Sequence, residues 1–126
     1  MIGAIIYAAL AADSTITGLV GTRIYPEEAP NETDLPQIVY AVKAQEVAEG
    51  TVPMWPCTVT ANCYAEDDAQ AETIGQAIRD VLDGFNGSDA SYLARGFVLS
   101  DYGEYRDQEL SEWGRLASFA GWIMRR

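Results

Sequence analysis

The 126-residue chain contains no histidine, which is the commonest general base and the commonest metal ligand near neutral pH. It is also poor in basic residues, since 8 Lys and Arg face 19 Asp and Glu and leave a formal net charge of −11. Binding to nucleic-acid phosphates depends on a cationic surface. The sequence therefore argues against histidine-dependent catalysis and against a protein that grips DNA or RNA over a broad face.

Long apolar runs are missing as well, and so are cysteine pairs that could form a disulfide or a zinc site. No run approaches the ~20 residues that span a bilayer, and the apolar start lacks the basic residues of a signal peptide. We expect a soluble, mature cytosolic chain with no membrane partner. Cys57 and Cys63 lie on one predicted strand about 20 Å apart, whereas a disulfide needs Cα atoms within about 7 Å. Neither belongs to a zinc motif, and both are interpreted as small buried apolar residues.

Apolar periodicity predicts two main helices. The first covers residues 2–10 and is followed by a short helical turn, capped by Asp13 or Ser14, that ends at Gly21. The second begins at the N-cap Asp67 and presents one apolar face over residues 71–85. Each helix has one apolar face that must be buried against another layer.

Period-two alternation predicts the strands. Long strands are expected at 37–47, 57–65, 91–101 and 115–124, with a short extended piece at 23–25. The proline-rich segment 26–36 is expected to be an exposed loop, and the acidic segment 101–112 a connector. Neighbouring strands without intervening helices favour antiparallel pairing. The predicted fold is one α+β domain, residues 1–126, a two-layer sandwich with a mostly antiparallel sheet of four to five strands and two helices packed on one face.

No residue pattern indicates catalysis. The glycines around Leu19 lack the Lys-Ser/Thr of a phosphate-binding loop, and no histidine is present to activate a serine. Adjacent acids such as Glu27-Glu28 and Asp67-Asp68 are expected by chance in so acidic a chain, and the second pair caps a helix. We therefore predict that the protein is not an enzyme and binds no cofactor or metal.

Apolar residues in predicted loops are the candidates for a subunit contact. Tryptophan and tyrosine are enriched where subunits meet. The alternative is that each of these residues folds back onto the core of its own subunit. The interface candidates are Met54, Trp55 and Pro56 near a predicted hairpin tip, and Trp113 in the acidic connector.

The order of several weak motifs resembles one family. Residues 6–13 and 19–26 resemble the opening of the tail completion or tail-terminator proteins of long-tailed bacteriophages. The loop and strand at 29–40 and the helix at 71–84 also match that family. The resemblance covers residues 2–84 well and the last strands loosely. The segment 50–56 departs from the polar, glycine-rich tip that is usual there, so its contacts are expected to differ.

This resemblance implies a structural protein of the virion tail or neck, assembled in the host cytoplasm. Such proteins form a ring, typically of six subunits, that closes the tail tube, ends its growth and joins it to the head. The implied partners are other copies of the chain, the tail tube protein and the head–tail connector proteins. DNA passes through the ring and is not specifically bound.

The acidic excess suits a channel that DNA crosses without sticking, because an anionic wall repels phosphate. A solvated outer face is the alternative. Two other functions stay open: a head-side connector or adaptor ring, and an acidic DNA-mimic inhibitor. The mimic is disfavoured because the acids concentrate in predicted loops rather than in rows on helices. The channel-lining candidates are Glu27, Glu28, Glu32, Asp34, Asp101, Glu104, Asp107, Glu109 and Glu112.

Overall fold

The computed structural model describes residues 2–29, 34–44 and 54–125, and it contains three helices and six strands in this part of the chain. Two elements were expected only as short pieces: helix α2 (Ser14–Val20) is capped by Asp13, and β1 (Ile24–Pro26) follows it. The remaining elements are α1 (Ile2–Ala12), β2 (Gln37–Ala44), β3 (Met54–Ala65), α3 (Asp68–Leu82), β4 (Gly87–Ser88), β5 (Tyr92–Asp107) and β6 (Glu112–Arg125).

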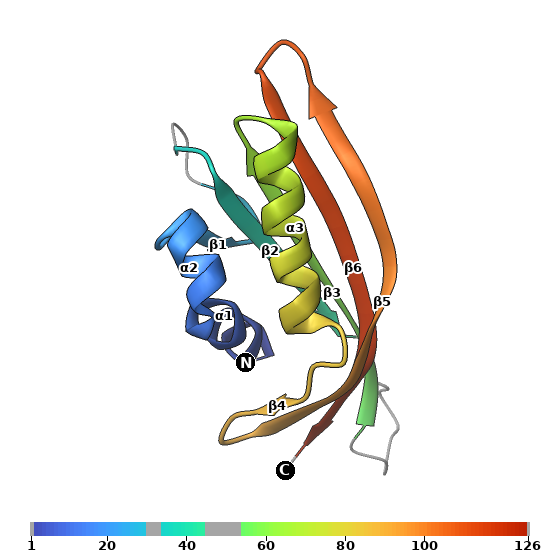
Figure 1. The fold of residues 1–126 in the computed structure, drawn as a ribbon. Helices are drawn as coiled ribbons and strands as arrows, with labels where there is room; N and C mark the ends of the chain where they lie inside the picture. Colours follow the sequence, from blue (N-terminus) through green and yellow to red (C-terminus); the bar gives the residue numbers. More distant parts are fainter. Residues whose placement is uncertain (1, 30–33, 45–53, 126) are drawn as a thin grey trace.

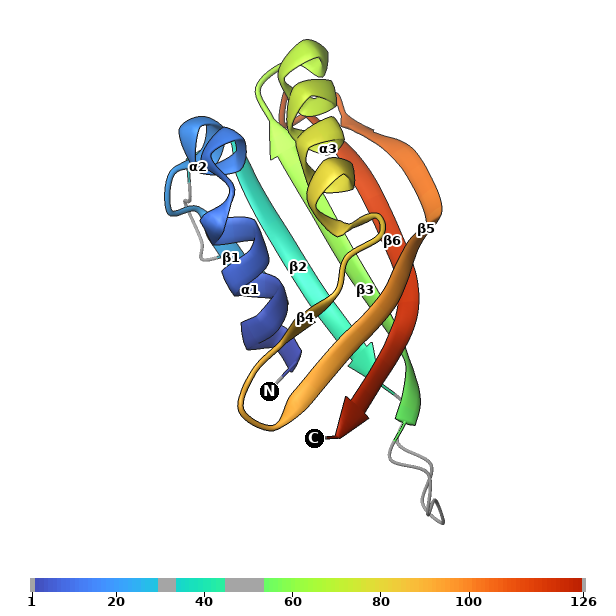
Figure 2. The ribbon, with the colours of Figure 1, turned by 60° about the horizontal axis from the view of Figure 1, so that its bottom comes forward.

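The strands form one sheet in the order β1-β2-β3-β6-β5-β4. Neighbouring strands are antiparallel except β1 and β2, which run parallel. The three helices lie together on one face of this sheet (Figures 1 and 2). The α+β layering is therefore as predicted, whereas the sheet is mixed and has six strands instead of four to five. The extra strand is β4, whose two residues have a turn-like sequence that carries no strand signal.

The predicted acidic connector at 101–112 is wrong, because these residues form the outer part of a long hairpin. Strand β5 continues to Asp107 and β6 already begins at Glu112, and these two residues pair with each other. The turn between them covers only residues 108–111. This part of the hairpin extends past the N-terminal end of α3 (Figure 1). Its side chains are largely in solvent, so the backbone ladder, and not apolar alternation, defines the strands there.

Helix α3 is held in place by its cap and by its apolar face. The carboxylate of Asp67 accepts a hydrogen bond of 2.7 Å from the Gln70 backbone N–H, and the Gln70 side chain accepts one of 3.1 Å from the N–H of Glu66. The capping predicted at Asp67 is confirmed. The helix buries Ile74 and Ile78 against the sheet, where they join one continuous core.

The two cysteines belong to this core, as predicted. Both are buried on the helix-facing side of β3 and neither forms a disulfide. Burial raises the pKa of each thiol, Cys57 and Cys63, to about 11. Because the thiolate is the reactive form, both thiols are poorly reactive in the folded chain.

Candidate functional site

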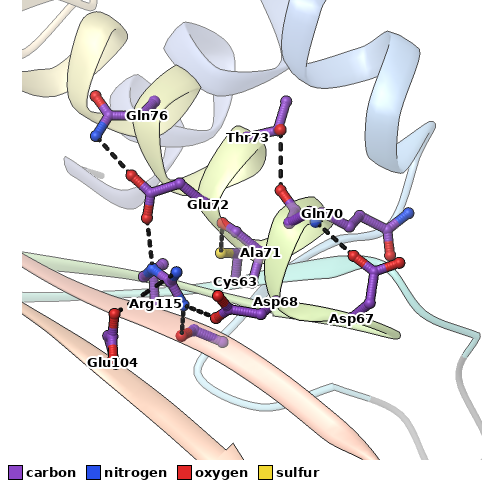
Figure 3. A network of polar contacts seen from close by, with 12 residues as sticks. Cys63, Asp67, Asp68, Gln70, Ala71, Glu72, Thr73, Gln76, Glu104 and Arg115 are labelled. Atoms are coloured by element: carbon purple, nitrogen blue, oxygen red, sulfur yellow. Dashed lines mark hydrogen bonds and ion pairs between the residues drawn. The ribbon is translucent and has the colours of Figure 1, made fainter.

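A buried arginine connects the long hairpin to the first turns of α3. Arg115 of β6 is 3 % exposed and faces the helix layer. Its guanidinium lies 2.8 Å from Glu72 and 3.0 Å from Asp68, and it also donates a 2.9 Å hydrogen bond to the carbonyl of Gly114. Glu104 of β5 approaches from the other side at 3.8 Å (Figure 3). One guanidinium thus joins α3, β5 and β6.

The ionisation of this cluster is set by its hydrogen bonds. The pKa of Glu72 is lowered first by the hydrogen bond from the Gln76 amide and then by that from Arg115. Burial alone would lower the pKa of Arg115, but its bonds to Glu72 and Asp68 outweigh burial and raise it. Glu72 and Arg115 are therefore both charged near neutral pH. A charged, mutually paired cluster is suited to holding elements together rather than to proton transfer.

Close packing around the same arginine requires a glycine in α3. A Cβ atom at Gly75 would collide with the Tyr102 hydroxyl and lie 2.8 Å from Cγ of Arg115. The guanidinium of Arg79 sits 4.8 Å from the centre of the Tyr102 ring. The sequence analysis missed this cluster, although one signal was present: Arg115 continues the inward-facing series of Ala117, Phe119 and Ile123 and places a buried charge among apolar residues.

The acids predicted to line a channel fall into two groups at different edges of the sheet. Glu27 and Glu28 directly follow β1, which is an edge strand, and Asp34 shortly precedes β2; all three are exposed, whereas Glu32 lies outside the described residues. The other five lie on the β5–β6 hairpin. The structure therefore does not bring the eight described candidates together within one subunit.

The five hairpin acids have different local roles. The Asp107 carboxylate accepts backbone hydrogen bonds of 3.0 Å and 3.2 Å from Glu109 and Leu110, which closes the turn at the tip. Burial, and next the nearby Asp107, raise the pKa of Glu112. Glu104 belongs to the Arg115 cluster. Asp101 and Glu109 are exposed and remain the plainest candidates for facing a neighbour or a channel.

The four interface candidates differ in the direction and burial of their side chains. Met54 and Pro56 are exposed on the sheet face away from the helices, whereas Trp55 points to the helix side and is only 7 % exposed. Trp55 thus follows the alternative in which the side chain packs onto the core of its own subunit, because alternation along β3 places it on the same side as Cys57. Trp113 is half-buried and packs against the core, with the Arg106 guanidinium 5.8 Å from its ring. Whether any of the four contacts another subunit stays a prediction.

Large apolar side chains are exposed at positions that the sequence analysis missed. The sheet face opposite the helices exposes 48 % of Trp122, 54 % of Val98 and 37 % of Leu116. Trp122 lies within the strand predicted at 115–124. Pairing with Pro56 across the sheet places it on the outer face.

Nothing in the described part of the chain resembles a catalytic or metal centre. No group of three or more Cys, Asp or Glu side chains there is arranged to hold a metal ion. An open pocket of about 310 Å³ lies between Asp68, Glu104 and Arg106, beside the Arg115 cluster. Within the described ranges, no single helix is long and apolar enough to cross a membrane. Residues 3–12 and 14–20 meet that criterion only as a pair, by length and composition, and are bent by 87°.

Comparison with known proteins agrees with this structural character. The family described as tail completion protein gp17 matches residues 4–110. A chain from a solved structure titled "Virion of native gene transfer agent (GTA) particle" has the same fold, with a TM-score of 0.80 at 17% identity, covering 96% of this chain and 92% of that one. Among curated proteins, none matches this chain. The family is structural and not enzymatic, and because its match spans most of the sequence, the chain belongs to the tail completion protein gp17 family of phage tails.

Proposed function

We propose that the protein forms a ring that caps the phage tail tube, ends its growth and provides the joint to the head, with DNA passing through the ring. The observation that carries this proposal is the family match over residues 4–110. The fold shared with a chain of a phage-like particle supports it. The ring, most simply a hexamer built from one domain of residues 1–126 and assembled in the host cytoplasm, would contact the tail tube protein on one side and connector proteins on the other.

We further propose that exposed acids of the β5–β6 hairpin face the channel. Asp101 and Glu109 are exposed and neither pairs with Arg115, so their charges are available to repel phosphate. The hairpin carries five carboxylates, which lie within a few strand positions of one another. A strand arm of this kind also differs from the regular helical rows of acids expected of a DNA mimic, so the mimic is not favoured.

Deletion of the gene, followed by electron microscopy of the particles, tests the ring-capping role. We expect overlong, unterminated tail tubes beside DNA-filled heads without tails, with normal particles restored when the gene is supplied separately. Tails of normal length that fail to attach would instead assign the protein to the head-side connector class. Normal virions would refute a role in tail assembly altogether.

A matched pair of charge variants tests the channel proposal. Asp101→Asn with Glu109→Gln removes two exposed hairpin charges, and Asp80→Asn with Glu66→Gln removes two exposed charges from elsewhere. If the hairpin faces the channel, only the first variant slows DNA ejection from otherwise normal particles. Equal ejection kinetics in the two variants would show that the hairpin acids lie on a solvated outer surface.

A further inference from the structure

The sheet face opposite the helices is uncharged along its two central strands. Its side chains are those at the even positions 54–64 of β3 and 114–124 of β6, and none of them carries a charge. Three of the large apolar side chains exposed on this face are Met54, Leu116 and Trp122, and Val98 of β5 adjoins them. Exposed charges on β5 border this strip, with Arg95 opposite Trp122 and Asp101 opposite Ser118. In a chain with a net charge of −11, so large a gap in the charge pattern needs an explanation. Depletion of charge around exposed large apolar residues is typical of the centre of a protein interface.

A second uncharged surface lies on the other layer of the molecule. Helix α1 contains no charged residue, and the Tyr7 hydroxyl is its only polar side-chain group. One side of the helix, including Ile6 and Leu10, is buried in the core. The opposite side exposes Tyr7 at 41 % together with Ala4, Ala8 and Ala12. A helix that is apolar all round is normally covered on all sides, and here one side is open.

The identity of the partner follows from charge and from position. Two copies with a net charge of −11 repel each other, so copies can associate closely only through surfaces that lack acids. The two uncharged surfaces lie on opposite sides of the molecule, because α1 and the outer sheet face are separated by the sheet itself (Figure 2). A closed ring is built from contacts in which one patch of each copy meets a different patch of the next. The sheet face presents protruding large side chains, and α1 presents mainly alanines that leave room for them.

We propose that neighbouring copies associate head to tail, with the exposed side of α1 in one copy packed against the uncharged strip of β3 and β6 on the sheet face of the next. This contact deepens the proposed function, since it rests on the ring proposed above. Ala8 lies in the middle of the exposed side of α1. Ala120 lies between Thr58 and Val98 in the middle of the sheet face. These two positions are therefore expected to come close only between different copies.

Cysteine cross-linking tests this geometry directly. The variant Ala8→Cys with Ala120→Cys carries one new thiol on each surface, and a short bis-maleimide would join them only across a subunit contact. The native thiols of Cys57 and Cys63 are buried and do not compete. The control variant, Ala8→Cys with Ala69→Cys, moves the second thiol to an exposed position on α3. Cross-linking is carried out on assembled particles and on the concentrated purified chain.

We expect the first variant to give a ladder from dimers up to the full ring, while the control and the two single-cysteine variants stay monomeric. Dimers from either single variant would overturn the proposal, because they would mean that identical faces meet. A double variant that enters particles and gives no ladder would overturn it as well. If gene deletion leaves virions normal while the concentrated chain still gives the ladder, the tail role fails and the contact stands.

Discussion

Two tryptophans that are neighbours in the sheet but face opposite sides provide the sharpest test of the structure. Trp55 points into the core at 7 % exposure, whereas Trp122 on the next strand points outward at 48 %. Replacing a buried tryptophan by alanine removes its packing and leaves a cavity, which costs about 3–5 kcal/mol. An outward tryptophan in an isolated subunit has fewer contacts to lose, so we expect Trp122→Ala to cost about 1 kcal/mol or less.

These costs translate into well separated melting temperatures. For 126 residues with an unfolding entropy of about 2.1 cal/mol/K each, a loss of ~4 kcal/mol lowers Tm by about 15 °C and a loss of ~1 kcal/mol by about 4 °C. The assay is thermal unfolding followed by circular dichroism. It is repeated at two protein concentrations, because subunit association would otherwise add to the apparent stability.

Assembly is expected to fail in both variants, but for different reasons. Trp122→Ala should keep its fold and lose incorporation into particles, whereas Trp55→Ala should fail through poor folding. Equal losses of Tm in the two variants would contradict the sidedness of β3 and β6. Normal incorporation of Trp122→Ala would show that the exposed indole is not part of a contact.

Three further predictions concern the Arg115 cluster. Arg115→Met leaves its acidic neighbours without their cation and should lower the free energy of unfolding in urea by about 1–3 kcal/mol; an unchanged value would mean that the cluster contributes no net stability. The pKa of Glu72 is lowered in the folded state by Gln76 first and then by Arg115. The ionised Glu72 side chain therefore stabilises the fold fully above the usual carboxyl pKa, and this stabilisation is lost as the pH falls through the lower pKa of the folded state. The stability difference between the wild type and Glu72→Gln should therefore shrink on acidification below about pH 4.3, and a constant difference would disprove this linkage. Gly75→Ala should destabilise the protein despite the better helix propensity of alanine. Gly18→Ala, where a Cβ meets nothing within 4 Å, should be neutral or stabilising by up to about 1 kcal/mol. Comparable Tm values for the two variants would contradict the close packing of α3.

The parts of the fold that could be predicted from sequence are those in which one local signal dominates. Asp67 and the apolar spacing after it were sufficient to place α3, because a cap and a 3.6-residue period agree there. Period-two alternation of apolar residues is likewise a single dominant local signal, and it was sufficient to place β2 and most of β3. Extending that alternation two residues back from Cys57 would also have placed Trp55 on the buried side.

The remaining parts depend on contacts that are distant in sequence. The outer end of the hairpin has no apolar alternation, so the pairing of Asp107 with Glu112 is visible only in the three-dimensional ladder. The partners of Arg115 are equally remote, since Glu72 precedes it by 43 residues. The exposed group around Trp122 is gathered from three strands. No local sequence pattern predicts which side chains from different strands come together, so the candidate surfaces could be predicted only in part.

The length of the β5–β6 hairpin has a mechanical consequence. At about 3.3 Å per residue, the 16 residues of β5 span roughly 50 Å, so a single ladder of hydrogen bonds runs from the tip beyond α3 to the end near the C-terminus. Its register is interrupted at two places, between Arg95 and Val98 and between Leu99 and Asp101, beside Gly96 with its φ of 67°. We therefore expect the parts of the hairpin on either side of these shifts to act as stiff units, and a load applied at the tip to bend the hairpin where its register is interrupted.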